Sequence, residues 1–379
     1  MIRSIIAATR EIDEPEIAVA EIKDALDLEN SLLKNSLGII SCFSEFEETG
    51  VLKAVCDALP FDCIGTTTCV SAVGSEIDQM LLAITVLTSD DCEFKTSVIN
   101  IDENYESAIG AAVPELLSSL PEKPALMLSY FPLNKSIGGD MILATLGQTA
   151  DDIPIFGTVA VDHKPDYSTA GAIYNGEVLS TSAVLGAVCG PVKVSFETAS
   201  LNEEKIRKQQ AVITESKGSL LIGVNGKSVS EYLGEIGLEE SEFLGLVPFV
   251  ISHKDGTKSV ARAVYAFTPE GYAVCGGTMP EGATLAIGRV DAADVLATAE
   301  EAFAPLAEKG SVVLGYSCIA RYLALGLNIT TEAEKLTEAA DGANYHLAYS
   351  GGEICPLRGA DGSMINYFHN YSIVFCKLS

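Results

Sequence analysis

A repeated order of strand, helix, strand and glycine turn runs along the chain and restricts the folds that it can adopt. One copy occupies residues 39–67, a second residues 126–159 and a third residues 312–353. In each copy an apolar β-type run leads through a helical pattern to a second β-type run and a polar turn. This alternation predicts an α/β fold (mixed α+β) built from repeated strand–helix–strand–hairpin units. Polar residues would then lie at equivalent strand ends in the three copies.

The length and composition allow more than one domain. Of the 379 residues, 48% are hydrophobic, which is enough for a large core. A strand-like run at 192–196 gives way to the charged run 203–208, and a different pattern begins with a strand at 220–227. We therefore predict an N-terminal domain at 1–206 and a C-terminal domain at 207–379, both with mixed sheets and flanking helices.

Several elements carry clear local signals. Apolar residues at helical spacing predict helices at 13–33 and 291–309, the second of which begins at an aspartate and ends at a glycine. Two β-type runs at 80–87 and 94–100 predict a β-hairpin. Ser228 follows an Asn-Gly turn and is placed to cap the helix that comes after it.

The charge of the chain argues against several classes of partner. The formal net charge is −28, and the clustered Lys and Arg that nucleic acid or an anionic membrane requires are missing from the sequence. The apolar stretch at 5–8 is too short for a secretory signal, and the run at 312–329 carries Arg321 in its middle. We expect a soluble cytoplasmic protein that binds neither nucleic acid nor membranes.

The cysteines and histidines have no metal-binding spacing in the sequence. The ten cysteines form no C-x-x-C pair, and the four histidines lie far apart. We expect most of these cysteines to be small buried hydrophobes, and we expect no metal site. Cys318 is the cysteine to test for reactivity, because Arg321 would lower the pKa of its thiol if the two side chains lay close together.

The last quarter of the chain gathers polar residues among apolar strands. Arg321 follows the strand at 312–318, where its guanidinium could hold a carboxylate bidentately or form an internal ion pair with Glu353. Glu353 could instead accept an ammonium group, which together with Arg321 would suit a zwitterion. Asn370 and Ser372 alternate along one strand and point to the same face, toward a ligand or toward the glycine turn.

Gly-Thr dipeptides end strands in the other two copies. They offer backbone N–H groups and hydroxyls to an anion, although turn chemistry alone also explains them. Neither has the Gly-Lys-Ser/Thr spacing of a phosphate-binding loop. The residues that we predict to bind a ligand, over all three copies, are Cys318, Arg321, Ser350, Gly351, Gly352, Glu353, Asn370, Ser372, Ser44, Gly65, Thr66, Thr67, Gly157 and Thr158.

Taken in order, the motifs of the chain resemble those of the FIST family, a sensory module of prokaryotic signalling proteins. The second half resembles the C-terminal FIST domain in 220–232, 247–249, 262–264 and 279–283, then in Cys318 with Arg321, Gly352-Glu353-Ile354 with Pro356, and 369–372. The first half resembles the N-terminal FIST domain in Phe43-Ser44, Gly65-Thr66-Thr67 and Phe156-Gly157-Thr158. Together the two resemblances cover nearly the whole chain after the first helix.

Three positions depart from the family's pattern. Tyr349-Ser350-Gly351 replaces the usual aromatic before the glycine–glutamate element, Asn370-Tyr371-Ser372 replaces a final Asn-x-Thr, and Glu45-Phe46 follows Ser44. The last change adds a carboxylate near the expected site. These departures bear on the identity of the ligand more than on the scaffold.

The resemblance implies a sensor and not an enzyme. Family members are fused or adjacent to histidine kinases, diguanylate cyclases and chemoreceptors, and amino acids have been proposed as ligands. We therefore expect a module that binds a small polar metabolite, of the amino-acid or carboxylate class, without a cofactor. We recognise no transmitter segment in the sequence, so a signal would pass by ligand-dependent contact with such a partner.

Three other functions stay open at this stage. One branch of the family binds haem and senses nitric oxide, and the imidazole candidates for that role are His163, His253, His346 and His369. An enzyme would use Cys318 as its nucleophile, with a histidine brought close by folding. A scaffold without a ligand would have a fully packed strand-end region.

Overall fold

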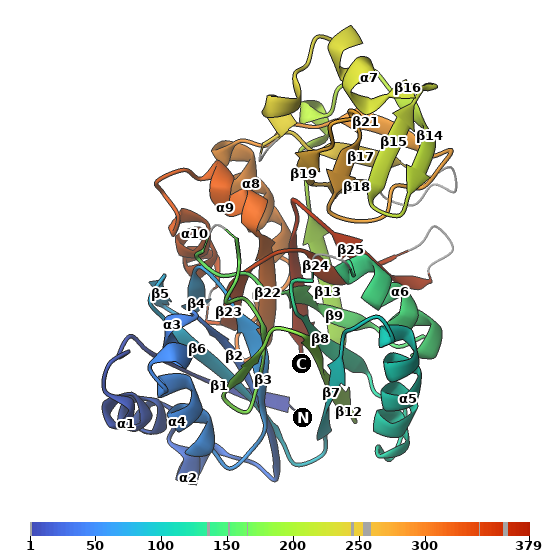
Figure 1. Cartoon of the computed structure of the whole chain (residues 1–379). Coiled ribbons are helices and arrows are strands. Elements are labelled where there is room, and N and C mark those ends of the chain that lie inside the picture. The colour runs from blue at the N-terminus through green and yellow to red at the C-terminus, as the bar shows by residue number, and fades with distance from the viewer. Residues whose placement is uncertain are drawn as a thin grey trace.

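The computed structural model divides the chain into three repeated units and one inserted lobe (Figure 1). We call the three units together the body. In each unit the elements follow the order strand, helix, strand, helix, strand, β-hairpin and strand. The structure describes residues 2–134, 137–150, 152–164, 166–243, 246–252, 259–340, 342–358 and 363–379.

The first two units follow one another directly. The first consists of β1 (Ile2–Thr9), α1 (Pro15–Leu26), α2 (Leu28–Ser31), β2 (Asn35–Cys42), α3 (Glu45–Glu48), α4 (Val51–Asp57), β3 (Cys63–Thr67), β4 (Ser71–Val73), β5 (Glu76–Asp78) and β6 (Leu82–Ser89). The second consists of β7 (Glu93–Asn100), α5 (Tyr105–Ser118), β8 (Leu126–Phe131), α6 (Gly139–Thr149), β9 (Ile155–Val159), β10 (Ala172–Tyr174), β11 (Glu177–Leu179) and β12 (Ser182–Cys189).

The third unit is interrupted after its first strand. It consists of β13 (Val194–Ala199), α8 (Ala292–Phe303), β22 (Val312–Cys318), α9 (Ile319–Ala324), α10 (Thr331–Ala339), β23 (Asn344–Ser350), β24 (Glu353–Arg358), β25 (Met364–His369) and β26 (Ile373–Leu378). The inserted lobe lies between β13 and α8, after a 3-10 turn at η1 (Glu203–Lys205). It contains β14 (Ala211–Lys217), β15 (Leu220–Val224), β16 (Lys227–Ser228), α7 (Val229–Glu235), η2 (Glu240–Phe243), β17 (Phe249–Ser252), β18 (Val260–Arg262), β19 (Val264–Phe267), β20 (Ala273–Cys275) and β21 (Thr284–Ile287).

The three units exchange their hairpins in a ring. Each body sheet has six strands, in the orders β1-β6-β2-β3-β10-β11, β7-β12-β8-β9-β24-β25 and β13-β26-β22-β23-β4-β5. The first four strands of each sheet come from one unit, and the last two are the hairpin of another unit. The central pair of each unit, β2 with β3, β8 with β9 and β22 with β23, is parallel. The ends of these pairs are therefore brought close to the neighbouring units.

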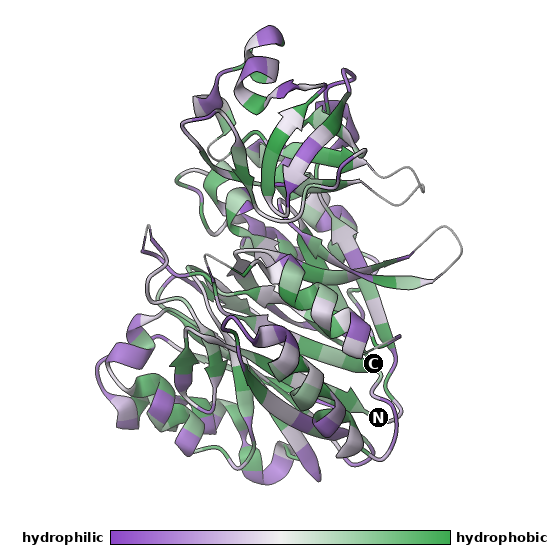
Figure 2. Ribbon diagram, turned by 45° about the vertical axis from the view of Figure 1, so that its right-hand side comes forward, coloured by the Kyte–Doolittle hydropathy of each residue, from purple (hydrophilic) through white to green (hydrophobic). Residues whose placement is uncertain are grey.

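The cores follow from this arrangement. One face of each sheet packs on a central core that takes residues such as Leu37, Leu128 and Leu314 from all three units. The other face is covered by helices, with α1 and α4 on the first sheet, α5 and α6 on the second, and α8 and α10 on the third. Figure 2 shows the hydropathy that goes with this packing. The strands inside the body are mostly hydrophobic, and along the helices hydrophobic and hydrophilic residues alternate. The inserted lobe has a separate core of its own.

The predicted threefold repeat is confirmed by the equivalent strand orders, and the mixed α/β class is confirmed with it. The predicted hairpin of 80–87 with 94–100 is wrong. Both strands form, as β6 and β7, but β6 lies between β1 and β2 whereas β7 pairs with β12 in another sheet. Every residue of β6 is buried, so this strand is central and not half of an exposed hairpin.

The predicted helices form with shorter bounds. The helix expected at 13–33 is broken at Asp27, whose φ of 43° ends α1. The helix expected at 291–309 begins at the predicted cap, where Asp291 accepts from Asp294 N at 3.0 Å, but α8 ends at Phe303. Ser228 caps α7 as predicted, in a reciprocal capping box with Glu231.

The division that the sequence predicts at 206/207 falls just before the inserted lobe. Strands from both sides of that position share the body sheets, since β23 pairs with β4 and β24 pairs with β9. Within the described residues, we find no helix that is long and apolar enough to cross a membrane.

Candidate ligand-binding site

The strand ends of the three units meet at a buried seam, as the repeat predicts. Thr67 Oγ1 of the first unit donates to Val161 O of the second at 2.8 Å. Thr158 Oγ1 of the second unit lies 2.7 Å from Ser350 Oγ of the third. Thr68 Oγ1 bonds to the backbone of β23, which joins the first unit to the third. These groups are all buried, so they bind one another across the seam.

The predicted strand-end glycines let parallel strands approach closely. A Cβ atom at Gly65 would lie 1.8 Å from Ile40 O, and one at Gly157 would lie 1.7 Å from Ser129 O. No real Cβ occupies such positions, so glycine is required here by the backbone. Thr66, the neighbour of Gly65, directs its hydroxyl to the next carbonyl at 3.0 Å. The Gly-Thr pairs therefore have a complete structural explanation.

Arg321 forms a buried ion pair, but not with Glu353. Its Nε and Nη2 donate to Glu332 Oε1 at 3.0 and 2.7 Å. Nη1 donates to Thr298 Oγ1 at 3.1 Å, and Nη2 also donates to Val295 O at 2.7 Å. The predicted pairing with Glu353 is wrong because α10 brings a closer carboxylate, that of Glu332, against the end of β22. Arg321 thus ties α8, α9 and α10 together.

Glu353 and Cys318 are buried side by side. Glu353 Oε2 accepts from Ser372 N at 3.4 Å, and Oε1 has no hydrogen-bond partner within the described part of the chain. Burial raises the pKa of Glu353 well above its ordinary value, and it raises the pKa of the Cys318 thiol in the same direction, with the Glu353 charge adding to the effect on Cys318. The expected lowering of the Cys318 pKa by Arg321 is therefore wrong.

The remaining predicted residues hold loops. Asn370 Oδ1 accepts from Ala263 N of the inserted lobe at 3.3 Å, which ties the lobe to the turn after β25. Ser372 Oγ donates to Asn370 O at 3.2 Å. Ser44 Oγ accepts from Thr169 Oγ1 at 3.1 Å, and a Cβ at Gly352 would collide with the ring of Phe368, 2.2 Å away.

The described histidines have local partners. His346 is buried between Ser41 Oγ, 2.7 Å from its Nε2, and Thr85 Oγ1, 3.1 Å from its Nδ1, and burial lowers its pKa to about 4. His369 Nε2 lies 3.0 Å from Cys355 O. The ring of the exposed His163 stacks on Phe43 with centroids 4.1 Å apart. His253 lies outside the described residues, and within them we find no cluster of three metal-binding side chains.

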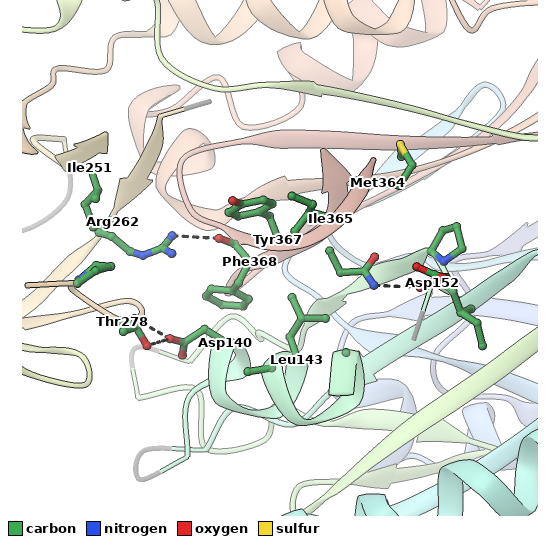
Figure 3. A pocket seen from close by; sticks show the side chains of 16 residues that line it. Asp140, Leu143, Asp152, Ile251, Arg262, Thr278, Met364, Ile365, Tyr367 and Phe368 are labelled. Carbon is green, nitrogen blue, oxygen red and sulfur yellow. Dashed lines mark hydrogen bonds between the residues drawn. The ribbon is translucent and has the colours of Figure 1, made fainter. Parts of the chain in front are cut away.

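A cavity between the inserted lobe and the body was not foreseen from the sequence. We call it the interlobe cavity. It has a volume of about 410 Å³, which is within the range of small-molecule sites. Its walls come from α6 and β25 of the body and from β17, β18 and the loop after β20 of the lobe. Figure 3 shows the side chains that line it, with Arg262 reaching from the lobe toward Phe368.

Arg262 is the buried cation of this cavity. The residue is only 7% exposed, and within the described part of the chain its side chain donates two hydrogen bonds, both from Nη1, to Ala261 O at 3.1 Å and to Phe368 O at 3.0 Å. Nε has no partner among the described residues. Burial lowers the pKa of Arg262, and the charge of Asp140 opposes that shift. Asp140 itself is held by Thr278, whose backbone N donates to Oδ2 at 2.6 Å.

A smaller cavity of about 120 Å³ adjoins the interlobe cavity. The two share Asp140, Thr278 and Phe368 in their linings. Of the predicted ligand-binding residues, Gly351 lines this smaller cavity, and Tyr265 of the lobe, 56% exposed, lines it from the other side. The predicted site therefore borders on an opening, although its charged members do not line it.

Family models match most of the chain. The FIST N domain matches residues 36–227 and the FIST C domain matches residues 227–356. This chain belongs to the FIST family. FIST domains are sensory modules of signal transduction, so the expectation from the motifs is confirmed at that level.

Other comparisons add little. Among solved structures, the crystal structure of a cyanuric acid hydrolase from A. caulinodans aligns with a TM-score of 0.40 and 8% identity, over 99% of each chain. A likeness this weak supports no statement about the activity of the FIST chain. No curated protein matches the sequence.

The sequence did contain one signal for Arg262. It lies between the apolar residues Ala261 and Ala263, where an arginine is unusual. Its burial and its lack of a carboxylate partner among the described residues are tertiary properties, and these distinguish it from an ordinary strand arginine.

Proposed function

We propose that this FIST module senses a small-molecule carboxylate, which binds at Arg262 in the interlobe cavity, and that it acts as a binding protein and not as an enzyme. The observation that supports this is a 7% exposed guanidinium without a carboxylate partner among the described residues. A buried charge normally needs a partner, because the loss of its hydration is costly. A ligand carboxylate would supply the missing charge and accept a hydrogen bond from the guanidinium.

The electrostatics of the chain make this cation distinctive. The net charge of −28 would repel an anion at long range, so a carboxylate needs a specific local site. Asp140 is the carboxylate that contributes most to the pKa of Arg262, but its Oδ2 already accepts a hydrogen bond from Thr278 N. A charge-assisted hydrogen bond from Arg262 to a ligand would contribute about 1.5–3 kcal/mol.

An amino-acid ligand is less well supported than a simple carboxylate. Glu353 was the predicted acceptor for an ammonium group, but it is fully buried and is not part of the lining of the interlobe cavity. Carboxylate binding depends on Arg262 alone and does not require Glu353.

Signal transfer would use the position of the inserted lobe. A ligand in the interlobe cavity contacts α6 and β25 on one side and the lobe on the other. Its binding would favour one lobe orientation and thereby change the surface offered to a signalling partner, for which a histidine kinase, a diguanylate cyclase or a chemoreceptor is the candidate.

The rival functions find no comparable support in the geometry. The raised pKa keeps Cys318 as a thiol, which is the weaker nucleophile. Both ring nitrogens of His346 and one of His369 lie at hydrogen-bond distance from local partners, so neither is poised to bind haem iron.

Thermal unfolding with and without sodium butyrate or sodium benzoate tests the proposal, with sodium chloride at equal ionic strength as the reference. At a concentration tenfold above Kd, bound ligand stabilises by about 1.4 kcal/mol, or roughly 2 °C for a chain of this length. Arg262→Met should abolish the shift, and Arg262→Lys should retain part of it. The exposed Arg289→Met is the matched control and should shift like wild type.

Two outcomes would overturn the proposal. One is the absence of any carboxylate-dependent shift in the wild type. The other is a shift in Arg262→Met equal to that of wild type, with both proteins folded by circular dichroism.

A further inference from the structure

Several polar groups around the interlobe cavity are used by the protein. Asn366 accepts from Ile155 N at 2.8 Å and donates to Ile153 O at 2.9 Å. Asp140 and Thr278 bond to each other through both the backbone N and the hydroxyl of the threonine. Asp152 and Tyr367 also line the cavity, and Arg262 is the one cationic side chain among its described lining residues.

The rest of the lining is largely apolar. Ile365 and Met364 of β25 are each 40% exposed, which is high for large hydrophobic side chains beside a cavity. Figure 3 shows Arg262 at one side of the cavity, Phe368 and Leu143 in the middle, and Met364 with Ile365 beyond them. The apolar side chains that line the cavity are Leu143, Ala144, Ile153, Pro154, Ile251, Pro280, Met364, Ile365 and Phe368.

The separation of the Arg262 guanidinium from the apolar part of the lining determines which kind of molecule fits the cavity. A carboxylate held at Arg262 would direct its body past Phe368 toward Ile365, along apolar walls. A second carboxylate on the same molecule would lose hydration along these walls, and beside Asp140 or Asp152 it would meet a like charge.

We infer that the ligand of this cavity is a monocarboxylate with an apolar alkyl or aryl body, and not a dicarboxylate. The inference rests on the proposed function and names the ligand class within it. Arg262 binds the charged end, and the α6 and β25 side chains select for the apolar end. The approximate 410 Å³ of the cavity accommodates a chain of several carbons or one ring.

A chain-length series tests the ligand class. Acetate, butyrate, hexanoate and octanoate would be compared by isothermal titration at constant ionic strength, with succinate as the polar probe. Each buried methylene should tighten binding about fourfold. Hexanoate should therefore bind much more tightly than acetate, and succinate should bind no better than acetate.

A variant on the apolar wall makes the test independent of Arg262. Ile365→Ser should flatten the dependence on chain length while leaving acetate binding unchanged, since Ile365 is far along the path from the guanidinium. Ile17→Ser, at a residue of α1 that is 49% exposed, is the matched control and should keep the wild-type series.

The results separate the two claims. Equal affinities along the series, or succinate binding as tightly as hexanoate, overturn the apolar class but leave carboxylate binding at Arg262 intact. If no carboxylate binds, or if Arg262→Met binds hexanoate as wild type does, the proposed function fails and the ligand class fails with it.

Discussion

The ion pair between Arg321 and Glu332 gives a prediction that separates structure from ligand binding. The Arg321 side chain is 2% exposed and that of Glu332 is 0% exposed. Arg321→Met would leave the Glu332 charge buried, with Ser317 as its remaining side-chain donor among the described residues, and would free the acceptors on Thr298 and Val295. Removing one partner of a buried ion pair costs about 3–5 kcal/mol, and we expect a loss of about 4 kcal/mol.

The assay is urea unfolding followed by circular dichroism. The double variant Arg321→Met/Glu332→Leu removes both charges, and we expect it to recover most of the loss, because a well-packed apolar pair often matches a buried ion pair in stability. Lys335→Met is the control. Its ion pair with Glu338 is exposed on both sides, so the free energy of unfolding should change by at most about 1 kcal/mol.

Two results would refute the structural reading of Arg321. The first is a cost for Arg321→Met no larger than that for Lys335→Met. The second is normal stability of Arg321→Met together with loss of the thermal shift by butyrate, which would return Arg321 to the ligand site that the sequence predicts.

Three further predictions concern buried groups. The pKa of His346 is about 4 in the folded chain and near 6.5 when unfolded, so protonation favours the unfolded state. The free energy of unfolding should therefore fall by about 3 kcal/mol as the pH drops from 6.5 to 4. The urea midpoint should decline more steeply with falling pH for wild type than for His346→Gln, and parallel declines would contradict this. Cys318 should react with a neutral thiol reagent no faster than the other buried cysteines, and selective fast labelling in mass spectrometry would favour the enzyme alternative instead. Gly157→Ala should destabilise or prevent folding, since its Cβ would meet Ser129 O, whereas Gly147→Ala in α6, with open space around it, should raise the free energy of unfolding by about 0.5–1 kcal/mol.

The repeat could be predicted because its signals are local. Apolar runs, helical spacing and glycine turns recur in the same order in each unit, and the ends of the strands then follow. The exchange of hairpins could not be predicted in this way. The pairing of β4 with β23 joins segments from opposite ends of the chain, and neither segment carries a local sequence signal that identifies the strand with which it pairs. The predicted hairpin of 80–87 with 94–100 failed for the same reason.

The candidate site could also be predicted only in part from the sequence. Residue types at strand ends correctly indicated that the three units meet, since Thr67, Thr158 and Ser350 bond across the seam or to neighbouring units. The partner of Arg321 depended on how α10 packs, and no spacing in the sequence distinguishes Glu332 from other acidic residues. Arg262 differs from Arg321 only in what surrounds it in the folded chain.

The inserted lobe explains why the proposed ligand site lies off the threefold seam. In a fully repeated body the polar strand ends can bind one another, and a seam whose groups are already paired has little affinity left for a ligand. The lobe breaks the repeat in one unit and covers the end of β25, where Ala263 N bonds to Asn370 and Arg262 bonds to Phe368 O. Arg262, whose Nε has no partner among the described residues, lies at this contact between lobe and body. A ligand that binds there would act on the same contacts that hold the lobe, so occupancy and lobe position would be linked.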